Sequence, residues 1–237
     1  MAAKGKIDYA QAGGLVACLI VVVALWDTWA VYPLRLLVVF FHELSHGFAA
    51  VVTGGSIVEI QMNAQEGGLC ITRGGNRFLT LTAGYLGSLM WGGAILLLAT
   101  RTKGGQIVLE LLGALLIVVT LIWVRPFIGF GFGFGLATGL VLIALANLLK
   151  SMATELVLIV IGLTSCLYAV LDIKSDILDR PHAVSDAVLL ADVTGIPAMV
   201  WGVLWLGVSV VLAVRFILIA SRHDTGPQSG ATSAPAP

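Results

Sequence analysis

Charged side chains are scarce in this chain. Of its 237 residues only 11% are Asp, Glu, Lys or Arg, while 59% are hydrophobic; an average soluble domain carries about a quarter charged residues. The 13 basic and 13 acidic residues balance, so no net positive field would attract nucleic acid. The composition excludes an ordinary soluble domain and gives no support for a nucleic-acid partner. It indicates the lipid bilayer as the main environment.

Cysteine is also rare. Cys18, Cys70 and Cys166 are isolated from one another, so they form neither a disulfide framework nor a thiolate metal site. A cleavable signal peptide is not indicated either. Lys4 and Lys6 precede an apolar stretch, but no small-residue cleavage site follows a short apolar core. We therefore expect the first apolar stretch to be part of the fold.

Apolar stretches long enough to cross a bilayer recur along the chain. A hydrocarbon core of roughly 30 Å needs about 20 apolar residues in a helix. By this measure the sequence predicts about six to seven transmembrane helices in an all-α, multi-pass membrane protein. The candidate spans are residues 14–31, 34–53, 79–100, 106–124, 127–149, 155–171 and 198–220.

The chain is expected to form one transmembrane domain with two short extensions. This domain covers residues 14–220 and follows an N-terminal segment at 1–13. Residues 221–237 are rich in Gly, Pro, Ser and Ala and are predicted to be a disordered tail. If the predicted spans alternate in direction, seven basic residues collect on one side and six on the other, which does not decide the orientation.

A polar segment interrupts the apolar pattern between residues 56 and 78. Apolar and polar residues alternate there around Ile57, Glu59 and Gln61, and again near Cys70, with a Gly-rich turn between the two stretches. Alternation with a period of two around such a turn is typical of a β-hairpin. We expect a small hairpin directly after the second transmembrane helix.

That second helix contains ionisable residues in its middle. His42, Glu43 and His46 lie in a segment otherwise suited to lipid. Ionisable groups at that depth persist where they face partners, a metal ion or a water-filled cavity. The two histidines are four residues apart, so they lie on one face of a helix and can bind one metal ion.

The pattern His-Glu-x-x-His predicts a zinc centre with a general base beside it. Zn²⁺ lowers the pKa of a bound water to about 7. The expected reaction is hydrolysis of a peptide bond. Glu43 is the expected base, which takes a proton from that water and passes it to the amine that leaves when the bond breaks. A catalytic zinc has three protein ligands and one open position, so the two histidines need a third partner from elsewhere in the chain.

Other functions fit the same residues less well. His42, Glu43 and His46 could form a structural polar network, a metal-binding scaffold or regulator without proteolysis, or a proton or ion path in a transporter. All the defining residues of the motif are present, which gives no reason to infer loss of proteolysis. A transporter is not supported by paired broken helices or an inverted repeat.

The sequence resembles the site-2 protease family of intramembrane zinc metalloproteases, and more closely its compact B-type branch. The resemblance implies hydrolysis of a membrane-embedded protein substrate, a hairpin that receives this substrate, and a location in the bacterial cytoplasmic membrane. It does not identify the substrate or the oligomeric state. The similar segments are Phe-His-Glu-Leu-Ser-His-Gly at 41–47, Thr-Gly-Gly at 53–55, Ala-Gly-Tyr-Leu-Gly-Ser at 83–88, and residues 167–173, 185–187 and 194–197.

The resemblance also implies the nature of the third zinc ligand. In this family it is an aspartate of a later transmembrane helix, usually followed by glycine. Here Leu171 and Asp172 match, but Ile173 replaces the glycine. Asp172 is the expected ligand because it lies closest to the membrane. The alternatives are Asp176, one helical turn further, and Asp186 and Asp192 in the next connection.

Overall fold

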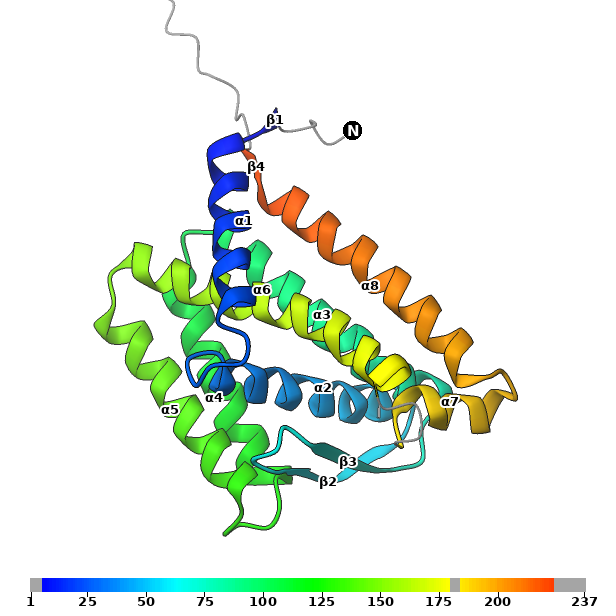
Figure 1. Ribbon diagram of the computed structural model, residues 1–237. Coiled ribbons are helices and arrows are strands. Elements are labelled where there is room, and N and C mark those ends of the chain that lie inside the picture. The colour runs from blue at the N-terminus through cyan, green and yellow to red at the C-terminus, as the bar shows by residue number, and fades with distance from the viewer. Residues whose placement is uncertain (1–5, 180–183, 224–237) are drawn as a thin grey trace, which may run out of the picture.

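The computed structural model describes residues 6–179 and 184–223. Helices dominate it, and two small antiparallel sheets complete it (Figure 1). The helices are α1 (Tyr9–Ala24), α2 (Tyr32–Val52), α3 (Arg77–Arg101), α4 (Gly105–Trp123), α5 (Phe130–Leu148), α6 (Ser151–Lys174), α7 (Asp186–Thr194) and α8 (Ala198–Ala220), with a short π-helix, η1 (Ser175–Asp179), after α6. The strands are β1 (Lys6–Ile7), β2 (Ser56–Met62), β3 (Gly68–Arg73) and β4 (Arg222–His223).

The helix lengths confirm the predicted fold class of an all-α polytopic membrane protein. Within the described residues, six helices are long and apolar enough to cross a membrane, namely α2, α3, α4, α5, α6 and α8. The first predicted span is shorter than expected, because α1 has 16 residues and ends before the Trp-rich turn that precedes α2.

Local sequence signals explain where α2 and α3 begin. Pro33 lies in the first turn of α2, where a proline costs no backbone hydrogen bond. The side chain of Asn76 caps α3 by accepting a hydrogen bond of 3.0 Å from the backbone N–H of Leu79. Between them, Gly54 has a φ of +89°, which glycine adopts without steric cost and which turns the chain out of α2 into the hairpin.

Small residues allow the helices to approach closely, as expected for a membrane bundle. At the crossing of α3 and α6, a Cβ on Gly92 would lie 2.7 Å from the carbonyl oxygen of Gly162. At the crossing of α4 and α5, a Cβ on Gly113 would lie 2.6 Å from the carbonyl oxygen of Gly139. Helix α3 packs against α2, α6, α7 and α8 and is therefore an inner helix of the bundle.

Helix α2 lies against both the bundle and the hairpin. It crosses the middle of the molecule in Figure 1, with α3 and α6 on one side and strands β2 and β3 along the other. Phe40 and Phe41 are fully buried, and the ring of Phe41 stacks on Trp91 of α3 at 5.4 Å. The residues of the predicted metal centre are thus held on a helix packed on several sides.

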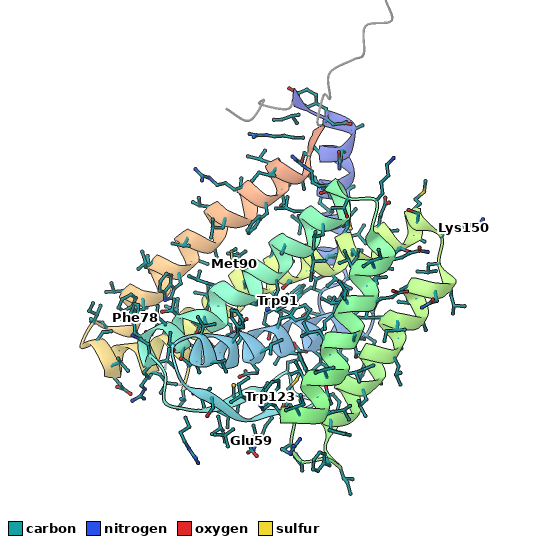
Figure 2. All side chains as sticks on the ribbon, turned by 180° about the vertical axis from the view of Figure 1, so that it is seen from behind. Glu59, Phe78, Met90, Trp91, Trp123 and Lys150 are labelled. Atoms are coloured by element: carbon teal, nitrogen blue, oxygen red, sulfur yellow. The ribbon has the colours of Figure 1, made fainter. Side chains whose placement is uncertain are left out.

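The predicted hairpin is present between α2 and α3. Strands β2 and β3 pair antiparallel, and the side chain of Asn63 organises the turn by accepting hydrogen bonds from the backbone of Gln65 and Gly67. The outer edge of β2 is held by the end of α4, where the N–H of Arg125 donates 2.9 Å to the carbonyl of Ile60. Figure 2 shows Trp123, at this end of α4, close to the hairpin that carries Glu59, and Lys150 at the opposite end of the bundle.

The two ends of the described chain lie together. Strands β1 and β4 pair, with Lys6 opposite His223 and Ile7 opposite Arg222 (Figure 1). Seven strictly alternating spans would place these ends on opposite sides of a membrane, whereas the two strands pair with each other. Strand β4 comprises the second and third residues of the segment predicted to be a tail. Residues 224–237, for which disorder is predicted, lie outside the described part.

Candidate metal centre

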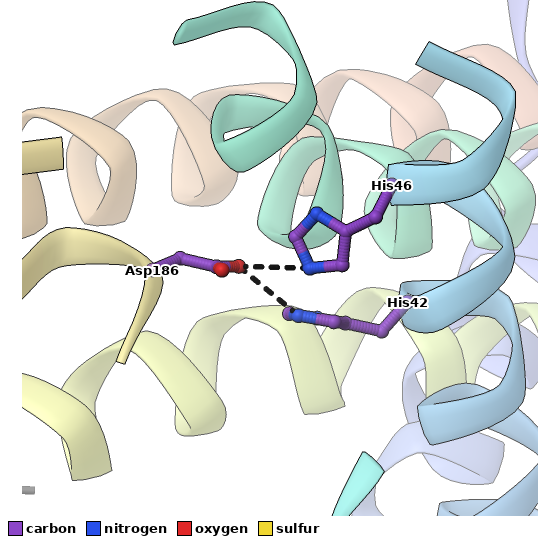
Figure 3. Close-up of side chains that lie close together, drawn as sticks. All are labelled: His42, His46 and Asp186. Carbon is purple, nitrogen blue, oxygen red and sulfur yellow. Dashed lines mark ion pairs between the residues drawn. The ribbon is translucent and has the colours of Figure 1, made fainter. Parts of the chain in front are cut away.

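The histidines of α2 converge on an aspartate from a distant part of the chain. His42 and His46 lie one turn apart, with ring centroids separated by 4.8 Å. Nε2 of His42 lies 3.1 Å from Oδ2 of Asp186, and Nε2 of His46 lies 3.2 Å from the same oxygen (Figure 3). Asp186 is the first residue of α7, which packs on α3 and α8.

The second nitrogen of His46 fixes the orientation of its ring. Nδ1 lies 2.7 Å from the backbone carbonyl oxygen of Thr80 in α3. A carbonyl can only accept, so Nδ1 carries a proton and Nε2 is the nitrogen that faces Asp186. This arrangement is the usual one for a histidine that binds a metal, whose other nitrogen donates to a carbonyl or a carboxylate.

The absence of a side chain at Gly84 leaves space at the point of convergence. A Cβ there would lie 2.5 Å from Oδ2 of Asp186, from Nε2 of His42 and from Cε1 of His46. Gly84 belongs to the Ala-Gly-Tyr-Leu-Gly-Ser segment at 83–88. This glycine keeps α3 close to the three side chains without filling the space between them.

The chemistry of this cluster fits zinc. Two imidazole nitrogens and a carboxylate oxygen are a common ligand set for catalytic zinc. Bonds of about 2.0–2.1 Å in a tetrahedron place neighbouring ligand atoms about 3.3 Å apart, close to the 3.1 and 3.2 Å found here. The oxygen that both histidines face, Oδ2 of Asp186, is buried and has no conventional hydrogen-bond partner among the described residues.

Asp186 remains a carboxylate in this environment. Burial acts to raise the pKa of Asp186, but the neighbouring imidazoles of His46 and His42 outweigh that effect and hold the pKa below its usual range. The charged form is the one that can bind a cation.

The predicted base, Glu43, lies in the same cavity as the histidines. The residue is 6% exposed, and it lines a cavity of about 630 Å³ together with His42, His46 and Asp186. Strand β3 forms another wall through Gly68, Leu69, Cys70 and Thr72. Glu43, the two histidines and Asp186 therefore face one cavity.

The predicted third ligand, Asp172, lies beside His42. Its Oδ2 is 3.8 Å from Nδ1 of His42, the nitrogen on the far side of the ring from Asp186. Asp176 accepts a hydrogen bond of 2.6 Å from the hydroxyl of Tyr85, and Asp192 is exposed. Of the four aspartates considered, Asp186 is the one in a group whose ligand atoms lie within 4.8 Å of one another.

The sequence contained a signal for Asp186 that its position obscured. Ser185 and Asp186 occur in one of the segments that resemble the site-2 protease family, but they lie outside any apolar span, and closeness to the membrane favoured Asp172. The structure shows that α7 returns to the bundle and places its first residue against α2.

Comparison with known proteins identifies the family. The family model described as Peptidase M50B-like matches residues 15–216, which include α2, the hairpin and α7. No curated protein and no solved structure gives a significant match. The M50B-like family comprises membrane metalloproteases and M50 peptidases use zinc, in agreement with the six apolar helices and the ligand set described above. Because the match covers most of the chain, this protein belongs to the peptidase M50B-like family of site-2 protease-like membrane proteins.

Proposed function

We propose that the protein is an intramembrane zinc metalloendopeptidase that hydrolyses a peptide bond of a membrane-embedded protein. The observation that carries this proposal is the convergence of His42, His46 and Asp186 next to Glu43, in a cavity that the membrane-spanning helix α2 helps to form. The cytoplasmic membrane of a bacterium is the proposed location, on the resemblance stated above.

His42, His46 and Asp186 would hold the metal. Zinc held there would lower the pKa of a bound water to about 7 and would act as a Lewis acid toward a peptide carbonyl. The backbone carbonyl of Thr80 accepts a hydrogen bond from Nδ1–H of His46, which leaves Nε2 as the nitrogen that would bind the metal. The carboxylate of Asp186 would be a charged metal ligand from another helix, and the metal would thereby connect α7 to α2.

Glu43 would move the protons. It follows His42 on α2 and lines the same cavity, so it lies beside the ligands and not among them. Its carboxylate takes a proton from the attacking water and gives it to the amine nitrogen of the leaving product. Burial of Glu43 excludes bulk water and strengthens its electrostatic interaction with the reacting groups.

Strand β3 offers a surface that could hold the substrate extended. Within the described residues its outer edge pairs with no other strand, and four of its residues line the cavity. The outer edge of β2 is occupied in part by Val124 and Arg125. A peptide unwound from a helix can add to the free edge of β3 through main-chain hydrogen bonds.

The variant Glu43→Gln tests this function. Gln keeps the size of the side chain but cannot accept the proton, so zinc should remain bound while proteolysis stops. New N-termini of membrane proteins would be labelled and identified in cells that express the wild type or the variant. Termini within transmembrane segments that appear only with the wild type support the proposal. Equal sets of termini from the two proteins, both retaining zinc, would favour the scaffold or transport functions.

A further inference from the structure

The carboxylate of Glu43 occupies the space that a side chain at residue 68 would take. A Cβ built on Gly68 would lie 2.6 Å from Cγ and 2.7 Å from Cδ of Glu43, and it would meet Oε1 more closely still. Values below about 3 Å do not occur in real contacts, so any larger residue at 68 forces Glu43 to move.

Backbone conformation does not explain the glycine. The described glycines with positive φ are Gly54, Gly74, Gly75 and Gly195, and Gly68 is not among them. It begins strand β3, where residues with side chains are normally preferred over glycine. The requirement for glycine therefore comes from Glu43.

The hairpin cannot retreat easily to make room. At one end, the N–H of Asn76 donates 2.8 Å to the hydroxyl of Thr53. Beside that end, a Cβ on Gly47 of α2 would lie 2.6 Å from Cδ1 of Ile57, so strand β2 and the helix are in direct contact. At the far end, the hydroxyl of Tyr32 donates 2.7 Å to the carbonyl of Ala64.

We propose that Gly68 is a positioning residue for Glu43, because the backbone of β3 forms the wall against which the general base is held. This proposal rests on the proposed function for the role of Glu43. It joins the strand that lines the substrate cavity to the group that moves the proton, so a displacement of β3 changes the position of the base.

Gly68→Ala tests the proposal, with Gly67→Ala as the matched control. A Cβ at Gly67 would meet the side chain of Asn63, not Glu43. Gly68→Ala should keep its zinc, because it contacts none of the three ligands, yet lose about 100-fold in kcat with KM unchanged, the cost expected for moving a catalytic group by about 1 Å. Gly67→Ala should keep its kcat within a few-fold of the wild type.

A second measurement needs no activity. In metal-free protein, Gly68→Ala should lower the midpoint of thermal unfolding by several degrees, because Glu43 is displaced. In a Glu43→Ala background the same change should leave the midpoint unchanged, because the obstructing side chain is gone. An equal loss in both backgrounds would mean that Gly68 serves only the hairpin and would overturn the proposal, whether or not the protein is a protease. An unchanged kcat in Gly68→Ala would overturn it while leaving the proposed protease intact.

Discussion

Nε2 of His42 lies 3.1 Å from Oδ2 of Asp186, although the two residues belong to different helices far apart in the chain. His42 lies on α2, the membrane-spanning helix against which the hairpin packs, while Asp186 begins the short helix α7 near the end of the bundle. The contact depends on α3, which packs against both helices and places Gly84 where a side chain would block the convergence.

Gly84→Ala should therefore abolish metal binding. The added methyl group would lie 2.5 Å from atoms of both histidines and of Asp186, so the ligands cannot keep their positions. Gly207→Ala is the control, because nothing lies within 4 Å of a Cβ there and Ala is favoured over Gly in a helix by about 1 kcal/mol. Zinc affinity measured with a competing chelator should fall more than 100-fold in Gly84→Ala only. Normal affinity in that variant would contradict the described geometry.

Glu66 should hold the tip of the hairpin on α2. Its Oε1 lies 2.9 Å from a guanidinium nitrogen of Arg35, and the two side chains are only 22% and 16% exposed. Such a pair contributes more than the ~1 kcal/mol of an exposed pair but less than the ~3 kcal/mol of a fully buried one. Glu66→Gln should accelerate amide hydrogen exchange at residues 63–67 by about tenfold. Glu59, half-buried on β2, provides the control, and equal exchange in Glu66→Gln and Glu59→Gln would show that the ion pair does not hold the tip.

Cys70 should react slowly and with an unusual pH dependence. Burial, and then the negative charge of Glu43, raise the pKa of the Cys70 thiol to about 12. The thiolate is the reactive form, so alkylation by N-ethylmaleimide should speed up about tenfold per pH unit from 7 to 10. An ordinary thiol with a pKa of about 8.5 would level off near pH 9. The rates would be measured with Cys18 and Cys166 replaced by serine. A plateau near pH 9 would show that β3 does not shield this thiol as described.

Much of the fold follows from composition and periodicity alone. Long apolar stretches predicted the spanning helices, and alternation around a Gly-rich turn predicted the hairpin. The end of the first span was predicted wrongly, because the apolar stretch continues through Trp26 and Trp29 although α1 ends at Ala24. The pairing of β1 with β4 was not predictable, because two-residue strands carry no periodic signal.

The candidate site was predictable only in its local part. His42, Glu43 and His46 share one helix, so their relation follows from a fixed helical spacing. Asp186 depends on the return of α7 to the bundle, which a one-dimensional reading of hydropathy does not describe. The contact of Gly68 with Glu43 was hidden for the same reason, since it depends on how the hairpin lies along α2.

The zinc content of four purified proteins tests the central claim most directly. The wild type, Asp172→Ala, Asp186→Ala and His46→Ala would be purified in detergent, reconstituted with Zn²⁺ and analysed by elemental mass spectrometry. The wild type and Asp172→Ala should hold about one zinc per chain, while Asp186→Ala and His46→Ala should hold almost none, because a stable site needs three protein ligands. Zinc retained in Asp186→Ala but lost in Asp172→Ala would contradict the proposed ligand set, and a wild type without zinc would contradict the metal centre altogether.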